Sequence, residues 1–261
     1  AILSSGMLQI NVFTDLIFAS GITGAAASLT YANFLVQAPL GIVSNSLLLP
    51  ILPNFAKLKD ESNSKELIRL IQRSLAFCSI SMTAIAAIFI SVHEPIIALF
   101  YGRGAFDNEA IQFVSTILIA YSIGMPAYLW RDLLVRVFYS IGEAKIPFKI
   151  STYGIIFNLI FDWTLIGAPT PWGSLSGFKL GASGLVYATL IVNIISSFLL
   201  ILKLNQRFLD LPIKNIAYKS LRILFSGIIA GFLSWLVSFL IGWPNSFTGL
   251  SIHIIISSGL C

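Results

Sequence analysis

The chain has 261 residues, of which 57% are hydrophobic and only 10% are charged, and its formal net charge is +5. Soluble domains carry about 25% charged residues, so this composition excludes a soluble globular domain. Several apolar runs reach about 20 residues, the length that an α-helix needs to cross a bilayer. We therefore predict an all-α fold, that of a polytopic helical membrane protein.

Seven apolar runs and the start of an eighth are predicted to span the membrane. The chain begins without a methionine and ends inside an apolar run, so we expect a fragment that is truncated at both ends. Cys78 and Cys261 lie in apolar stretches, which argues against a disulfide framework. The predicted spans are residues 7–29, 33–56, 68–92, 109–130, 148–167, 180–202 and 220–242, and the eighth begins near Phe247.

The basic residues alternate between the predicted loops. Fourteen of the sixteen lysines and arginines belong to the regions after the second, fourth and sixth spans, whereas only Arg103 and Lys179 belong to the alternate loops. This is the positive-inside pattern, and it predicts that the three basic loops are cytoplasmic. The positive charge therefore suits anionic lipid headgroups, and we expect no nucleic-acid partner.

Two polar residues interrupt the apolar segment from about Pro147 to Gly167. Asn158 and Asp162 are four residues apart, so they share one face of a helix. A carboxylate inside the hydrocarbon region costs about 3 kcal/mol or more and needs a partner. Two alternatives follow: Asp162 lies near a helix end and reaches the membrane interface, or it belongs to an ion or proton site inside a helical bundle.

The first predicted span repeats this spacing with Asn11 and Asp15. No basic residue lies in the middle of any predicted span, so Asp15 and Asp162 are expected to hold protons or to share a cation. The sixth span adds the hydroxyl of Thr189 and, one turn earlier, the backbone carbonyl of Leu185. Thr189 could help to free this carbonyl from its hydrogen bond within the helix. These hard oxygen ligands suit Na⁺ rather than a soft transition metal. No other metal or cofactor is predicted.

Charged residues also cluster near the end of the fourth predicted span. Asp132 and Arg136 form an i,i+4 pair in the favourable order, and Arg131 lies beside them. The two arginines are candidates for substrate binding, with a place at the cytoplasmic interface as the alternative. No catalytic residue is predicted, because His93 and His253 have no ligand or nucleophile spacing around them. We therefore do not expect an enzyme.

Five sequence motifs follow one another along the chain and together carry a resemblance to a known family. They are QINVFTDLIFAS, LTYANFLVQAPLGIVSNSLLLPILP, IIALFYGRGAF, LIAYSIGMPAYLWRDLLVRVFYSIGEAKIP and GASGLVYATLIVNII. Together they resemble the second lobe of the MurJ-type (MviN) lipid II flippases, which belong to the multidrug/oligosaccharidyl-lipid/polysaccharide exporter superfamily. The resemblance covers essentially the whole chain.

The resemblance implies that residues 1–261 are the C-terminal lobe of a two-lobe, fourteen-helix flippase, from helix seven to the start of helix fourteen. It implies a multi-pass protein of the bacterial cytoplasmic membrane. Its function would be to flip lipid II, the undecaprenyl-diphosphate-linked peptidoglycan precursor, by alternating access coupled to a cation. The implied partners are this precursor, membrane lipids and the missing N-terminal lobe of the same chain.

The resemblance also carries over a cation site. Family members with a sodium site build it from the seventh, eleventh and twelfth helices. Asp15, Asn158, Asp162, Thr189 and the Leu185 carbonyl match those positions. The resemblance therefore implies that these residues bind Na⁺ or a proton.

One departure from the family pattern concerns the substrate. Asn33 and Phe34 stand where many members have Asp-Arg, and that arginine is thought to help hold the substrate's diphosphate. Either the N-terminal lobe supplies the cationic contacts, or another residue of this chain substitutes. A related exporter of another lipid-linked saccharide or of a drug therefore stays open, as does a non-transporting membrane scaffold.

Overall fold

The computed structural model describes residues 13–58, 64–104, 106–167, 178–208 and 213–241, and the regular structure in these ranges is helical. A first helical segment covers residues 13–19. The later helices are α2 (Ala25–Val43), the π-helix η1 (Ser44–Leu48), α3 (Leu49–Lys57), α4 (Ser64–Ser91), α5 (His93–Tyr101), α6 (Asn108–Ser140), α7 (Lys145–Ile166), α8 (Ala182–Phe208) and α9 (Ile213–Ile241). The predicted all-α fold is confirmed, and the eighth predicted span lies outside the described residues.

Five helices are long and apolar enough to cross a membrane, which confirms a polytopic membrane protein. They are Ala25–Ser46, Lys65–Ser91, Asn108–Ser140, Ala182–Arg207 and Lys214–Leu236. The predicted span 148–167 is also a helix, the 22-residue α7. It does not belong to the set of five, because polar side chains such as Asn158 and Asp162 lower its hydropathy.

The predicted boundary between the first two spans is wrong. The sequence predicted continuous spans over residues 7–29 and 33–56, but the first helical segment ends at Ala19 and α2 begins at Ala25. The residues between them form turns, and Gly24 has a φ of 76°, in the left-handed region that glycine adopts without a steric penalty. Apolar residues continue on both sides of this turn, so hydropathy alone did not reveal it.

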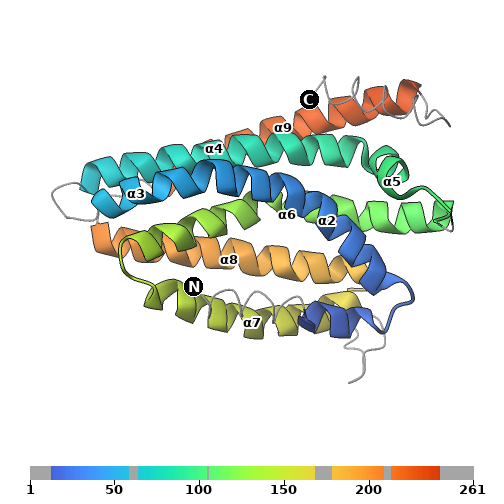
Figure 1. The fold of residues 1–261 in the computed structure, drawn as a ribbon, viewed down its shortest axis with the longest axis horizontal. Coiled ribbons are helices and arrows are strands. Elements are labelled where there is room, and N and C mark those ends of the chain that lie inside the picture. The colour runs from blue at the N-terminus through green and yellow to red at the C-terminus, as the bar shows by residue number, and fades with distance from the viewer. Residues whose placement is uncertain (1–12, 59–63, 105, 168–177, 209–212, 242–261) are drawn as a thin grey trace.

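The long helices run side by side along the longest axis of the molecule (Figure 1). At the centre is α6, which packs against α2, α4, α5 and α8, while α7 packs on α8 and α9 packs on α4. Buried residues are distributed all along α6, from Val114 to Phe138. A helix that is surrounded by other helices needs no polar face, and α6 therefore fixes the positions of its neighbours.

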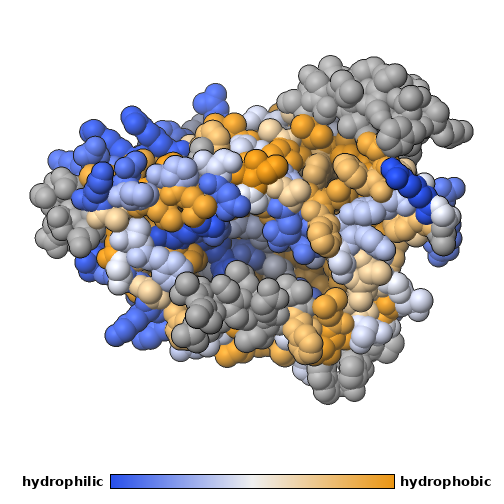
Figure 2. Space-filling model, in the orientation of Figure 1, coloured by the Kyte–Doolittle hydropathy of each residue, from blue (hydrophilic) through white to orange (hydrophobic). Residues whose placement is uncertain are grey.

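The helix ends form two groups (Figure 1). The C-terminal ends of α3, α6 and α8 lie at the left of the view, whereas the turn at residues 20–24 and the short α5 lie at the right. Hydrophilic residues gather at the left end of the surface (Figure 2). This separation agrees with the predicted alternation of basic loops, and the assignment of the left end to the cytoplasm stays a prediction.

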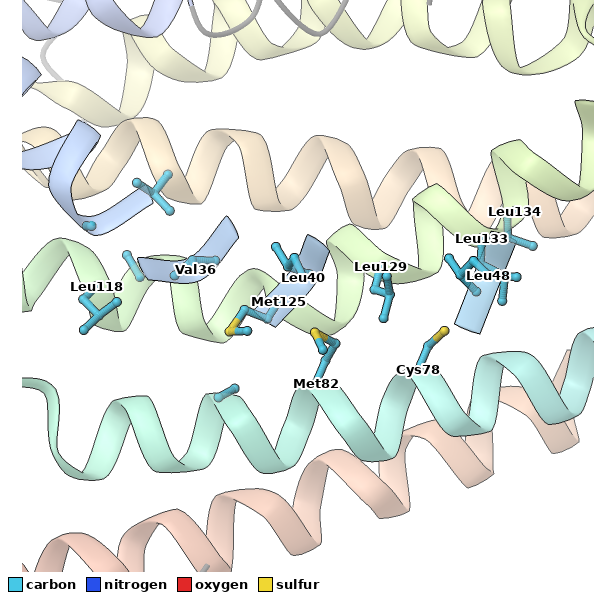
Figure 3. Close-up of a cluster of buried hydrophobic side chains, with 14 of the residues drawn as sticks. Val36, Leu40, Leu48, Cys78, Met82, Leu118, Met125, Leu129, Leu133 and Leu134 are labelled. Carbon is cyan, nitrogen blue, oxygen red and sulfur yellow. The ribbon is translucent and has the colours of Figure 1, made fainter. Parts of the chain in front are cut away.

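The core lies where α2, η1, α4 and α6 meet (Figure 3). Leu40 of α2 lies beside Met125 of α6, Leu48 of η1 lies beside Leu133 of α6, and Cys78 and Met82 of α4 close the cluster from the other side. Cys78 is a buried free thiol. Because lipid tails are as apolar as these side chains, close packing rather than escape from water holds the helices together.

Candidate functional site

The helix α7 turns polar side chains inward and apolar side chains outward. Its buried residues recur at four-residue intervals from Gly154 to Ile166 and include Asn158 and Asp162, each of which is 0% exposed. The opposite face exposes large apolar side chains such as Phe157. Asp162 is therefore enclosed by protein, although it lies only four residues before the end of α7 at Ile166.

Close backbone contact holds α7 against α8. At Gly154 an added Cβ would lie 3.3 Å from a methyl group of Val192 on α8. At Gly184, near the start of α8, it would lie only 2.7 Å from the carbonyl oxygen of Leu165. The same Leu165 carbonyl accepts a hydrogen bond from the backbone N–H of Leu180 at 3.1 Å. The two helices are thus fixed in register beside the buried polar pair.

Asn158 is the centre of a hydrogen-bond network between three segments. Its Nδ2 atom donates to Asp162 Oδ2 at 2.8 Å and to Asp15 Oδ1 at 3.2 Å, and its Oδ1 accepts from the Thr189 hydroxyl at 3.2 Å. One turn further along α8, Asn193 Nδ2 donates to the Thr189 carbonyl at 2.6 Å. The structure therefore brings together Asp15 from the first helical segment, the α7 pair and Thr189 of α8. Asn193, which sequence reasoning missed, extends the network.

The oxygen atoms of this network are of the kind that bind a monovalent cation or a proton. Both carboxyl groups contact one amide nitrogen, and Asp162 Oδ1 is buried with no hydrogen-bond partner in the part of the chain that the structure describes. The ion pairs among the described residues lie elsewhere, and these residues contain no group of three or more His, Cys, Asp or Glu that could hold a metal. Neutral oxygens such as that of Thr189 would have to complete a cation's shell. Leu185 is buried one turn earlier and its carbonyl stays a predicted ligand, while Asn11 lies outside the described residues.

A second polar cluster joins α6 to the π-helix η1. Arg136 Nε donates to Asp132 Oδ1 at 2.9 Å, the Ser44 hydroxyl donates to Asp132 Oδ2 at 2.7 Å, and Arg136 Nη2 donates to Ser44 Oγ at 2.9 Å. The predicted i,i+4 pair is confirmed as an ion pair. Ser44 was missed, although Pro39 and Pro50 on either side marked an irregular stretch of helix, and π-helices are frequent at functional sites.

Arg131 lies next to this cluster but has different partners. Its Nη2 donates to Ser151 Oγ of α7 at 2.9 Å, and its Nε is buried with no hydrogen-bond partner within the described ranges. Both arginines predicted to bind substrate are thus engaged within the protein, and Arg131 differs in having one buried donor without a partner among the described residues. At the position where the family pattern has an arginine, Phe34 is 71% exposed and Asn33 is half-buried.

Comparisons with known proteins place this chain in a family. The family model of the lipid II flippase MurJ matches residues 1–252. The probable lipid II flippase MurJ of Synechocystis sp. is 41% identical over 213 residues, which cover 82% of this chain and 38% of the relative. The probable lipid II flippase MurJ of Rickettsia prowazekii is 31% identical over 193 residues, which cover 72% of this chain and 38% of the relative. The chain thus spans less than half the length of these relatives.

Solved structures show the same fold. The lipid II flippase MurJ in an inward closed conformation matches with a TM-score of 0.73 and 26% identity, covering 97% of this chain and 49% of that chain. A MOP superfamily transporter from Pyrococcus furiosus has a TM-score of 0.65, but at 14% identity it supports the fold alone. Since the family model matches nearly all of the chain and two relatives exceed 30% identity, this chain belongs to the MurJ lipid II flippase family.

Proposed function

We propose that this chain is the C-terminal lobe of a transporter that flips lipid II, the undecaprenyl-diphosphate-linked peptidoglycan precursor, across the bacterial cytoplasmic membrane. The family match over residues 1–252 carries the proposal. The buried polar network supports it, because a membrane scaffold has no need for two carboxyl groups in its interior. The partners we expect are the lipid-linked precursor, the surrounding membrane lipids and the N-terminal lobe of the same protein.

Complementation tests this function. The full-length gene should restore growth to bacteria depleted of their own lipid II flippase. If the protein inserts normally into the membrane and growth is not restored, the related exporter of another lipid-linked saccharide or of a drug becomes the better proposal. Cargo export that is independent of lipid II would point the same way.

We further propose that transport is coupled to a cation, Na⁺ or a proton, bound by Asp15, Asn158, Asp162, Thr189 and the Leu185 carbonyl. A cation at this point would supply the positive charge that offsets repulsion between the two desolvated carboxylates. Here Thr189 donates to Asn158 Oδ1 and the amide nitrogen faces both carboxyl groups, so the amide would have to rotate before its oxygen could bind the cation. The ligands come from three segments, so binding would favour the conformation in which these segments are packed together.

Sodium-dependent stabilisation of the purified full-length protein tests this coupling. At constant pH, replacing K⁺ by Na⁺ should raise the unfolding temperature, and Asp162→Asn should weaken that shift. Asp107→Asn is the matched control, because Asp107 is the N-cap of α6 and asparagine caps a helix equally well. An unchanged Na⁺ response in Asp162→Asn would eliminate the sodium site, and a response to pH alone would identify the proton.

The third part of the proposal concerns the diphosphate of the substrate. We propose Arg131 and Arg136 as contacts, with Arg131 the stronger, because its Nε atom has no partner among the described residues. Arg136 would first have to exchange its bonds to Asp132 and Ser44. Arg131→Gln should therefore weaken lipid II binding to the full-length protein more than Arg136→Gln does. Equal affinities of both variants and the wild type would remove these residues from the substrate site.

A further inference from the structure

Two adjoining clefts lie at the end of the molecule that holds the end of α3 and the start of α4. One is an open cleft of about 880 Å³ between α3 and α4. The other, of about 230 Å³, lies where α4 meets the first turns of α9. Arg69 and Arg73 of α4 line both clefts. These two guanidinium groups therefore occupy the junction of three helices.

The clefts carry a strong excess of positive charge. Lys65, Arg69 and Arg73 recur every four residues and so share one face of α4, and Lys57 of α3 and Lys219 of α9 flank them. All five side chains are exposed. Among the residues that line the two clefts, the single acid is Glu66. The ion pairs of the described part of the chain do not involve these five cations. None of these ion pairs therefore offsets the repulsion among the five positive charges.

The position of the clefts along α4 suits an amphiphilic ligand. The spanning part of α4 begins at Lys65, and Arg73 lies eight residues further on, about 12 Å along the helix axis. Leu75 and Ile216 line the smaller cleft beside Arg73. In Figure 2 the hydrophilic residues at this end give way to apolar residues toward the middle of the molecule. A ligand here would meet cations at its head and apolar side chains below it.

We propose that Arg69 and Arg73 bind the phosphate of an anionic phospholipid from the membrane leaflet at this end, predicted to be the cytoplasmic one. Guanidinium groups bind phosphate oxygens in a bidentate manner. Lys57 and Lys219 add the longer-range attraction that basic side chains exert on anionic headgroups. The lipid would connect α3, α4 and α9, and this would fasten α9, which packs mainly on α4. This site does not depend on the proposed flippase function.

The test is a lipid titration of the purified full-length protein in neutral detergent. Short-chain phosphatidylglycerol should raise the unfolding temperature, whereas phosphatidylcholine of the same chain length should not. The Arg69→Gln/Arg73→Gln double variant should bind phosphatidylglycerol roughly tenfold more weakly or worse. Lys145→Gln/Lys149→Gln is the matched control, since it removes two exposed charges from the start of α7, away from the clefts. The control should respond as the wild type does.

Several results would overturn the proposal. Equal weakening in both double variants would mean that charge acts diffusely and that no site exists. Inorganic phosphate that stabilises as well as phosphatidylglycerol would assign the clefts to a soluble anion, and preferential displacement by lipid II would assign them to the substrate. The Arg69→Lys/Arg73→Lys variant keeps the charge and should fall between wild type and the glutamine variant. Wild-type affinity in this lysine variant would contradict bidentate binding.

Discussion

Replacing Gly184 by alanine should force the start of α8 away from the end of α7. The added Cβ would lie 2.7 Å from the carbonyl oxygen and 2.8 Å from the carbonyl carbon of Leu165. Both are backbone atoms, so no side-chain rotation can relieve the overlap. The helices must separate or bend, and the Thr189 hydroxyl, which lies 3.2 Å from Asn158 Oδ1, must move with α8.

The size of the effect follows from two opposing contributions. Overpacking a close contact costs about 1–3 kcal/mol, and alanine in place of glycine inside a helix returns up to about 1 kcal/mol. We therefore expect Gly184→Ala to lower the free energy of unfolding by about 1–2 kcal/mol, the middle of the range that these two contributions leave. The variant should also respond less to Na⁺, because the Thr189 contact is displaced.

The assay is unfolding of the full-length protein by SDS in mixed micelles, followed by tryptophan fluorescence. Gly41→Ala is the matched control: it makes the same change inside α2, where nothing lies within 4 Å of the new Cβ. We expect this control to be neutral or slightly stabilising. If Gly184→Ala and Gly41→Ala unfold with the same free energy, the close contact between α7 and α8 is absent and the reasoning fails.

Three further predictions follow from the helix arrangement. Single cysteines at Lys145 and Arg103 should be labelled from opposite sides of the membrane, and labelling of both from one side would contradict the topology. Gly167→Ala should lower the free energy of unfolding by at least about 1 kcal/mol, because φ is +61° there and the new Cβ would lie 2.7 Å from backbone atoms. Ser44→Ala removes a partner of Asp132 and should cost about 1–2 kcal/mol in SDS unfolding, whereas an unchanged stability would show the bond to be replaced by water.

Hydropathy predicted most of the helices, because runs of apolar residues are what a bilayer requires. It failed between Ala19 and Ala25, where a turn lies inside a continuous apolar stretch. It also gave no sign that α6 is central. Lipid and protein interior are equally apolar, so a helix that faces lipid and a helix that faces other helices have similar compositions.

The candidate site was predictable to the extent that it breaks the apolar pattern. Asn158 and Asp162 stand out from their neighbours, and their common helix face follows from their spacing. That Asp15 and Thr189 meet them is a tertiary fact, which the residues alone left open. Ser44 itself does not stand out, because serine is common in membrane helices; the prolines around it mark an irregular stretch, but the contact with the Asp132 oxygen 2.7 Å away is tertiary.

The one-sided arrangement of α7 has a consequence for how the protein is made. An aspartate at the centre of a membrane helix adds about 2.5–3.5 kcal/mol to the free energy of insertion by the translocon. Asp162 lies closer to the end of α7 and adds less, but α7 also contains Asn158 and is not among the five strongly apolar helices. Until α8 has been synthesised, nothing from that helix covers the buried face of Asn158 and Asp162. We therefore expect α7 to enter the bilayer together with α8, as a helical hairpin in which α8 already covers Asn158 and Asp162. Membrane insertion of α7 would then be delayed until α8 has been synthesised.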